Sequence, residues 1–126
     1  MHYIEKYPLY FMTPRGDIAT GEVLRYLSPM TADKLFHLLP IRSMVIRRGC
    51  LLVIEKDVRE GVERGKRSLS TGEIAYSPLS KAIMVALCDV DVSHPVNPLG
   101  RVIENLSALE RLQTGESIVL HVELMP

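Results

Sequence analysis

Short apolar stretches separated by turn-forming residues run along most of the chain, and this pattern predicts a mainly β protein. Every position of residues 82–87 is apolar, so this run is predicted to be a central strand with both faces buried. Residues 117–124 place large apolar side chains at every second position, as in a half-buried strand. The other strands are predicted at residues 9–12, 23–27, 44–46, 50–54, 73–76 and 100–104.

Two short helices are predicted between these strands. Ser28 and Pro29 suit a helix start. The serine hydroxyl can accept a hydrogen bond from a free backbone amide, and the N–H that proline lacks is not needed at the first helical position. The apolar face of this helix is formed by Ala32, Leu35, Phe36 and Leu39. Asn105 is predicted to cap a second helix that carries three leucines and ends at Gly115.

Two connections lack a clear periodic pattern. Residues 55–66 are rich in charge and glycine, which predicts a solvated loop or an exposed edge strand. Residues 89–99 contain Pro95 and Pro98, which predict an irregular connection before the next strand.

Length and charge indicate one ordinary globular domain over residues 1–126. The chain is 47% hydrophobic and 24% charged, with 15 basic and 15 acidic residues. A neutral balance supplies no long-range attraction to phosphate backbones or anionic lipid, so neither nucleic acid nor a membrane is expected as a partner. The longest apolar run, residues 82–88, is too short to span a bilayer, and the start shows no export signal, which predicts the cytoplasm.

The potential metal ligands do not form a recognised pattern. Cys50 and Cys88 lie in apolar stretches, as buried thiols do in a reducing compartment, and a disulfide between them is the alternative. No Cys-x-x-Cys pair is present to suggest a zinc site. Cys88, Asp89, Asp91 and His94 have no known metal spacing, so the sequence predicts a solvated loop there and no metal or cofactor.

Two segments carry a family resemblance. Gly100-Arg101-Val102-Ile103-Glu104-Asn105-Leu106, followed by Leu109 and Leu112, resembles the C-terminal segment of cyclophilins, and residues 29–36 resemble the start of their first helix. The chain is more similar to a family of uncharacterised prokaryotic cyclophilin-like proteins. That match is carried by Gly72, Tyr76, Pro78, Ala82 and the segment Val96-Asn97-Pro98-Leu99-Gly100-Arg101-Val102. The resemblance implies a closed antiparallel cyclophilin-like β-barrel of about eight strands with two short helices.

The resemblance does not carry the isomerase chemistry with it. Cyclophilins place an arginine near the prolyl nitrogen, next to an apolar pocket, whereas the alignment puts Val45 at the arginine position and the chain has no tryptophan. These departures favour a protein that is not an enzyme. Arg42, Arg47 and Arg48 lie near enough in sequence to replace the missing arginine, so a peptidyl-prolyl cis-trans isomerase with an altered site is the alternative hypothesis.

Two predicted turns supply the candidate binding residues. Tyr76, Pro78 and Lys81 surround the turn that enters the central strand, and Asn97 precedes the Gly100 strand. If both turns line one groove, Tyr76 offers a flat apolar face and Asn97 offers amide donors and acceptors. The simpler interpretation, that Pro78 and Asn97 only fit turn geometry, has about equal weight.

Arg47 is included as a cation for a carboxylate or phosphate, although Arg47 and Arg48 should point to opposite faces of their strand and a solvated pair is favoured. The leading hypothesis is therefore a module that binds a small molecule or peptide segment in a surface groove without isomerase activity. A third hypothesis is a structural module that associates with itself, for example as a homodimer.

Overall fold

The computed structural model describes residues 4–124 as strands joined mostly by short turns. The strands are β1 (Lys6–Met12), β2 (Ile18–Leu24), β3 (Ile41–Arg48), β4 (Leu51–Glu55), β5 (Lys66–Leu69), β6 (Glu73–Ser77), β7 (Ala82–Ala86), β8 (Val90–Glu104) and β9 (Ser117–His121). A 3-10 turn, η1 (Arg25–Leu27), leads into helix α1 (Pro29–Leu38), and helix α2 (Leu106–Glu110) precedes β9.

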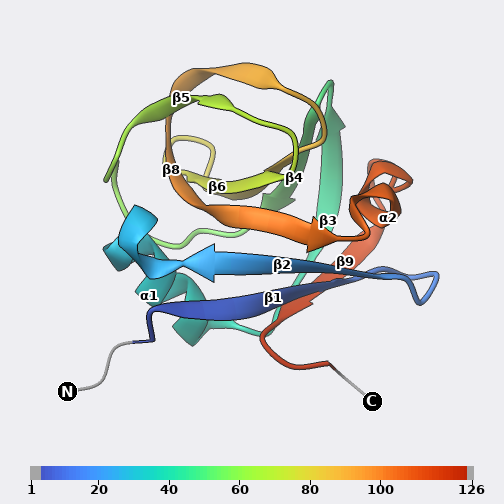
Figure 1. Ribbon diagram of the computed structural model, residues 1–126. Coiled ribbons are helices and arrows are strands. Elements are labelled where there is room, and N and C mark those ends of the chain that lie inside the picture. The colour runs from blue at the N-terminus through green and yellow to red at the C-terminus, as the bar shows by residue number, and fades with distance from the viewer. Residues whose placement is uncertain (1–3, 125–126) are drawn as a thin grey trace.

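Eight of these strands form a closed antiparallel barrel, which confirms the predicted fold. Neighbouring strands pair in the order β2-β1-β9-β3-β4-β7-β6-β8, and β2 pairs with β8 to close the ring. Helices α1 and α2 lie at opposite ends of the barrel (Figure 1). The additional strand, β5, pairs with the first part of β8.

Glycines permit the closing pair to come together. A Cβ at Gly100 of β8 would overlap the carbonyl oxygen of Glu22 on β2, and a Cβ at Gly21 would lie 2.8 Å from Cδ1 of Ile74. Any side chain at Gly100 would therefore push β8 away from β2. The Gly100-Arg101-Val102 segment that carries the resemblance thus has a steric role at the seam of the barrel.

The barrel interior holds the main hydrophobic core. Leu9, Phe11, Leu52, Ile54, Ile83 and Leu99 are among its fully buried side chains. Ala32 and Leu35 of α1 join this core at one end, and Leu109 and Leu112 of the α2 region join it as well. The Tyr7 hydroxyl donates to the carbonyl oxygen of Ala32 at 2.7 Å, which ties β1 to α1.

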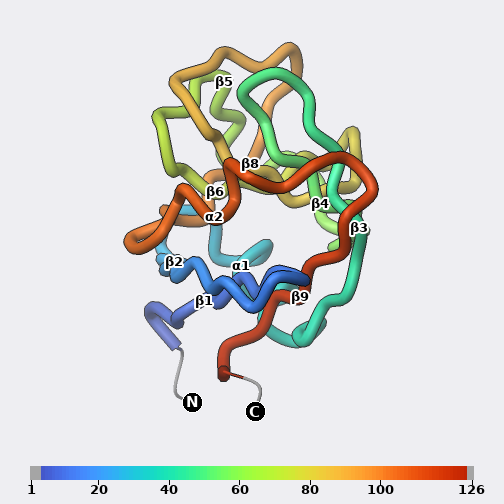
Figure 2. Tube along the Cα trace, turned by 90° about the vertical axis from the view of Figure 1, so that its right-hand side faces the viewer, coloured from blue at the N-terminus to red at the C-terminus, as the bar shows by residue number. Residues whose placement is uncertain are grey.

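A second apolar layer covers the outside of β4, β7 and β6. It contains Val53, Leu69, Ala75, Ala82, Met84, Ala86 and Val96. The layer forms because β5 and the first part of β8 fold back over these strands, on the side of the molecule away from β1 and β9 (Figure 2). Strand β7 is consequently buried on both faces, as its continuous apolar sequence predicts.

Several boundaries differ from the sequence predictions: β1 and β3 are longer than expected, β9 ends at His121, and β8 and β2 differ as follows. Residues 90–104 form one long strand, whereas an irregular connection was expected up to residue 99. This strand is extended throughout because β5 pairs with its first part and both β6 and β2 pair with its later part. The pairings with β5 and β6 contain bulges, which allow a strand to include prolines although they cannot donate a backbone hydrogen bond. Pro98 is aligned with Ala75 of β6. Strand β2 starts at Ile18 and ends at Leu24, so Tyr26 belongs to η1.

The predicted helix caps also differ. Ser28 and Asn105 occupy the two N-cap positions, but neither side chain makes a capping bond. The Asn105 amide donates instead to the carbonyl oxygen of Ile18. Within the described residues, no helix is long and apolar enough to cross a membrane.

Candidate functional site

Residues 56–65 cross the end of the barrel next to α1 without forming a helix or strand. This stretch, called the 56–65 segment below, links β4 to β5 and was predicted to be a solvated loop or an exposed edge strand. Its Val58 side chain is only 2% exposed and belongs to the interior core. The segment is therefore fixed to the barrel, although many of its charged side chains face solvent.

Tyr76 holds the first part of this segment. Its side chain is buried in the barrel core, and its hydroxyl accepts a hydrogen bond from the backbone N–H of Val58 at 3.1 Å. The same hydroxyl lies 3.4 Å from a carboxylate oxygen of Asp57. Burial, with the nearby Asp57 charge adding to it, raises the pKa of the Tyr76 phenol, so the residue is a neutral structural group at physiological pH.

Asn97 holds the other part of the segment. Its Oδ1 accepts from the N–H of Glu63 at 2.7 Å, while its Nδ2 donates to the carbonyl oxygen of Gly61 at 2.9 Å. The second Nδ2 hydrogen reaches Oγ1 of Thr31 on α1 at 3.0 Å. The amide is fully buried and both of its polar atoms are occupied by the protein.

Glu63 is the residue that caps α1. Its carboxylate accepts from the backbone N–H groups of Met30 and Thr31, at 2.9 and 3.0 Å, and from the Thr31 hydroxyl at 2.8 Å. A negative charge there also complements the helix dipole. The sequence assigned this role to the adjacent Ser28. Glu63 was missed because it lies more than 30 positions from the helix start, and no local motif joins the two.

A groove opens on one side of the 56–65 segment. The Tyr26–Arg101 groove, as it is called here, has a volume of about 480 Å³ and is lined by Leu24, Tyr26, Leu27, Arg64, Lys66, Glu73, Pro98, Gly100 and Arg101. The Tyr26 side chain is 67% exposed although it is large and aromatic. An Nη2 of Arg64 donates to the Tyr26 carbonyl oxygen at 3.0 Å and fixes η1 against the segment.

The charges of the groove are only partly compensated. Lys66 pairs with Glu73 at 2.9 Å. Burial opposes ionisation of Glu73, but the hydrogen bonds from Lys66 and Ser70 outweigh it and lower the pKa of this carboxyl. The Arg101 side chain makes no hydrogen bond or ion pair with another residue of the described range 4–124. The groove thus combines an exposed aromatic ring with a guanidinium that has no acidic partner in the described part of the chain.

The five residues proposed from the sequence lie in three places. Tyr76 and Asn97 are register partners on β6 and β8. Pro78 is half-buried and Lys81 is exposed at the turn between β6 and β7, where Lys81 adopts a positive φ of 52°. Arg47 is at the other end of the barrel, where its Nη1 donates to the carbonyl oxygens of Glu110 and Leu112, at 2.8 and 3.1 Å.

These positions change the roles that the residues can play. Tyr76 and Asn97 support the 56–65 segment from inside, and Pro98, next to Asn97, lines the Tyr26–Arg101 groove itself. Arg47 satisfies carbonyl groups at the end of α2. Val45, aligned with the cyclophilin arginine, is fully buried in the barrel core, whereas Arg42 and Arg48 are exposed. Tyr26, Arg64 and Arg101 were missed because only the fold brings them together.

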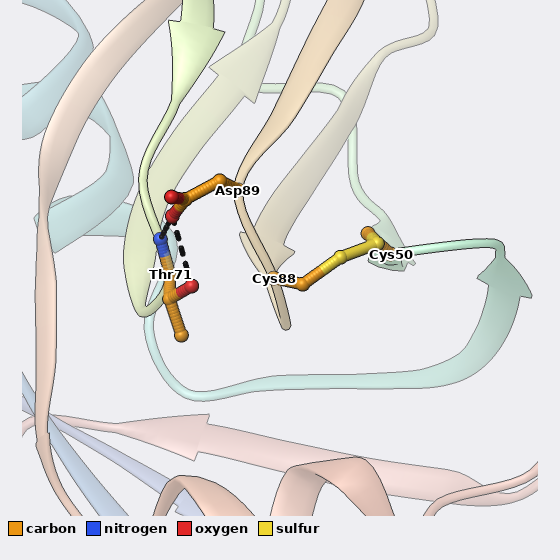
Figure 3. The surroundings of a disulfide bond; sticks show 4 residues. All are labelled: Cys50, Thr71, Cys88 and Asp89. Atoms are coloured by element: carbon orange, nitrogen blue, oxygen red, sulfur yellow. Dashed lines mark hydrogen bonds between the residues drawn. A yellow bond between two sulfur atoms is a disulfide. The ribbon is translucent and has the colours of Figure 1, made fainter.

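The two cysteines form a disulfide, which decides between the alternatives that the sequence left open. Cys50 lies in the turn before β4 and Cys88 follows β7 (Figure 3). Their Cα atoms are 5.3 Å apart, within the usual range for such a bridge.

The acidic residues beside the disulfide hold the covering layer in place. Asp89 accepts from the backbone N–H and the hydroxyl of Thr71, at 2.8 and 2.9 Å (Figure 3). These two bonds lower the pKa of the Asp89 carboxyl. Asp91 accepts from the Ser68 hydroxyl on β5 at 2.9 Å. Within residues 4–124, no group of three or more His, Cys, Asp or Glu side chains is arranged to hold a metal ion.

Comparison with known families agrees with this architecture. The family model described as Cyclophilin-like matches residues 15–121, which is most of the chain. The chain belongs to the cyclophilin-like family. This confirms the resemblance seen in the Gly100 segment and in the first helix. No curated protein gives a significant match.

Among the solved structures that are similar to this cyclophilin-like chain, two are compared with it. The solution structure of the hypothetical protein AF2241 from Archaeoglobus fulgidus has a TM-score of 0.80 at 23% identity, over 97% of this chain and 98% of that one. A structure of McbB in complex with tryptophan has a TM-score of 0.78 at 18% identity, over 94% of this chain and 45% of McbB. This chain therefore corresponds to less than half of McbB, and at these identities the likeness shows a shared fold.

Proposed function

We propose that this cyclophilin-like domain is a binding module whose ligand is a small molecule with an aromatic body and one anionic group. The ligand would occupy the Tyr26–Arg101 groove. The observation that carries the proposal is the position of Arg101, which lines a partly apolar groove and has no acidic partner among residues 4–124.

The apolar part of the ligand would contact Tyr26. An aromatic side chain that is 67% exposed leaves apolar area in contact with water, and a planar ligand group can cover it by offset stacking. Leu24, Leu27 and Pro98 extend the apolar lining. Because Arg64 holds the Tyr26 carbonyl oxygen, the backbone that carries the ring is already ordered, which lowers the entropic cost of binding.

The charged part would contact Arg101. Arg64, Lys66 and Arg101 supply three positive charges, and Glu73 supplies one negative charge that pairs with Lys66. The groove therefore has a net charge of +2, so an anion is favoured over a cation. A carboxylate matches the guanidinium especially well, because both groups are planar and can form two parallel hydrogen bonds.

Tryptophan is a reasonable first probe because McbB, which shares the fold, is known in complex with it. Its indole ring and carboxylate correspond to the two parts of the groove, and its ammonium group is of the sign that Glu73 attracts. Indole-3-acetate keeps the ring and the carboxylate without the ammonium group. Indole keeps the ring alone, so the three compounds separate the apolar and ionic contributions.

The test is an NMR titration of the 15N-labelled chain with each probe. We expect indole-3-acetate to shift the backbone amides of Tyr26, Arg64 and Arg101, with indole binding about tenfold more weakly because it lacks the charge-assisted hydrogen bonds. Arg101→Ala should weaken the binding of indole-3-acetate by a similar factor. Arg48→Ala, which removes an exposed arginine outside the groove, is the control. Equal binding by indole and indole-3-acetate, or no effect of Arg101→Ala, would contradict the proposal.

The hypotheses of isomerase activity and self-association predict different results. A coupled proline-isomerisation assay would favour the isomerase if turnover is detected and is abolished by Arg42→Ala or Arg48→Ala. Light scattering would favour the self-associating module if the solution mass corresponds to a dimer. The cytoplasm remains the location predicted from the sequence, but the Cys50–Cys88 disulfide favours an oxidising compartment or an organism in which intracellular disulfides persist.

A further inference from the structure

A second groove lies between the first part of the 56–65 segment and α1. It has a volume of about 520 Å³, and Lys34, His37, Lys56, Asp57, Val58 and Arg59 contribute to its lining. None of these residues lines the Tyr26–Arg101 groove. We propose that this second groove, called the Arg59 groove below, binds a small phosphate monoester.

The first argument is the charge of the lining. Lys34, Lys56 and Arg59 are cationic, and Asp57 is the only carboxylate among the lining residues. Glu60, just outside the groove, pairs with Lys34 at 2.8 Å. The side chains of Lys56 and Arg59 make no hydrogen bond or ion pair within the described part of the chain. Two cationic side chains that are not held in ion pairs within residues 4–124 can both turn to one ligand, and this suits a dianionic phosphate better than a single carboxylate.

Asp57, the acidic residue of the lining, already accepts a hydrogen bond from the backbone of the 56–65 segment. An Oδ1 of Asp57 accepts from the backbone N–H of Arg59 at 2.8 Å and lies 3.4 Å from the Tyr76 hydroxyl. Asp57 therefore acts on the backbone of the segment, and within residues 4–124 its carboxylate forms no ion pair with the side chain of Lys56 or Arg59. Its charge reduces the attraction for an anion, but it leaves Lys56 and Arg59 available as donors.

The backbone of Arg59 supplies the second argument. Its φ is 60°, in the left-handed region that glycine adopts much more readily than arginine. The conformation is held from both sides, since Asp57 accepts from the Arg59 N–H and Nζ of Lys34 donates to the Arg59 carbonyl oxygen at 2.7 Å. Keeping an arginine where glycine fits better is expected when the side chain itself has a use.

The apolar atoms of the groove determine which phosphate is suitable. Leu38, which is half-buried, and the aliphatic parts of the lysine side chains border the cationic positions, so an ester with an organic group gains contacts that inorganic phosphate lacks. Phenyl phosphate is the probe chosen for this reason. Inorganic phosphate and benzyl alcohol are the matched compounds, because each keeps only one of the two parts.

An NMR titration of the full 15N-labelled chain tests the proposal. Phenyl phosphate should shift the amides of residues 56–59 and of His37, with both matched compounds binding at least about tenfold more weakly. Arg59→Gly should weaken the binding of phenyl phosphate about tenfold, because the guanidinium is removed. It should not lower the melting temperature, because glycine adopts the left-handed backbone conformation without strain. Arg59→Asn, which also tolerates this conformation, serves if the glycine variant folds poorly. Arg48→Ala is the control and should leave the affinity unchanged.

Three results would overturn the inference. The first is unchanged affinity in both Arg59 variants. The second is a set of shifts confined to Tyr26, Arg64 and Arg101, which would place the phosphate in the other groove. The third is equal binding by phenyl phosphate and benzyl alcohol, which would mean that the phosphate is not recognised. The second result would support the Tyr26–Arg101 groove as an anion site, and the first and third leave indole-3-acetate binding unaffected, so failure of this inference is distinguishable from failure of the proposed function.

Discussion

Tyr76 and Asn97 face each other as register partners on β6 and β8, and their buried side chains hold two different parts of the 56–65 segment. Tyr76 fixes the segment at Val58, beside the Arg59 groove. Asn97 fixes it at Gly61 and Glu63, next to Arg64 of the Tyr26–Arg101 groove. One pair of neighbouring strands therefore positions the shared wall of both candidate binding sites.

Replacing Tyr76 by phenylalanine should loosen the first of these attachments. The variant keeps the ring in the core but leaves the buried Val58 N–H without its acceptor, which should cost about 1–2 kcal/mol of unfolding free energy in urea titrations. The amide of Val58 should also exchange faster with deuterium. Tyr10→Phe is the control, since the Tyr10 hydroxyl has no hydrogen bond within residues 4–124. Equal stability of the two variants would show that the Tyr76 hydroxyl does not hold the segment.

Replacing Asn97 by alanine should have a larger effect. The change removes the partners of Glu63 N–H, Gly61 C=O and the Thr31 hydroxyl at once, and we expect a loss of about 2–4 kcal/mol. Chemical denaturation measures the loss. Gln113→Ala, which removes an exposed amide side chain, should change stability by less than about 0.5 kcal/mol. A loss below 1 kcal/mol for Asn97→Ala would be evidence against a buried network at this position.

Stability should fall at alkaline pH because of Tyr7. Burial, and to a smaller extent the Asp33 charge, raises the pKa of the Tyr7 phenol above its ordinary value of 10.0. Near pH 10, Tyr7 loses its proton in the unfolded chain but keeps it in the folded chain. The contribution of Tyr7 to the free energy of unfolding is therefore complete below pH 10 and is lost as the pH rises further. Urea unfolding between pH 8 and pH 11 should show this decline.

The variant Tyr7→Phe separates this contribution from others. It should be about 1 kcal/mol less stable than the natural protein at pH 8, because the bond to Ala32 is lost. Above pH 10 its stability should depend less steeply on pH, although Tyr76, whose pKa is also raised, still contributes. Parallel pH profiles for the two proteins would contradict the assignment.

Reduction of the Cys50–Cys88 disulfide should destabilise the fold. The bridge joins residues 38 positions apart, and a loop of this length corresponds to about 3–4 kcal/mol of lost stability in the chain-entropy model. Thermal unfolding with and without dithiothreitol measures the effect. A variant with Cys50→Ser and Cys88→Ser should resemble the reduced protein and should not respond to the reductant. If the oxidised and reduced proteins have the same melting temperature, the bridge does not stabilise the fold.

Local patterns were sufficient for most of the elements. The apolar run of β7 and the alternation of β9 depend only on which faces of a strand are buried. That property can be recognised from the consecutive residues of the strand itself. Gly100 was recognisable from the family resemblance, and its steric reason is the close approach of Glu22. By contrast, Ser28 occupies the predicted N-cap position but its side chain makes no capping bond, and a carboxylate from a distant segment accepts from the free amides at that end of α1.

The sequence by itself determined a mainly β chain, the position of its helices and the cyclophilin-like barrel, since each follows from periodicity, turn residues or motifs that are short in sequence. Only the tertiary structure decided that Tyr76 and Asn97 are buried supports, and that Tyr26, Arg64 and Arg101 share one groove. Burial of a polar side chain depends on whether distant backbone groups come within hydrogen-bond distance of it. That distance is set by barrel closure and cannot be read from the residues beside it.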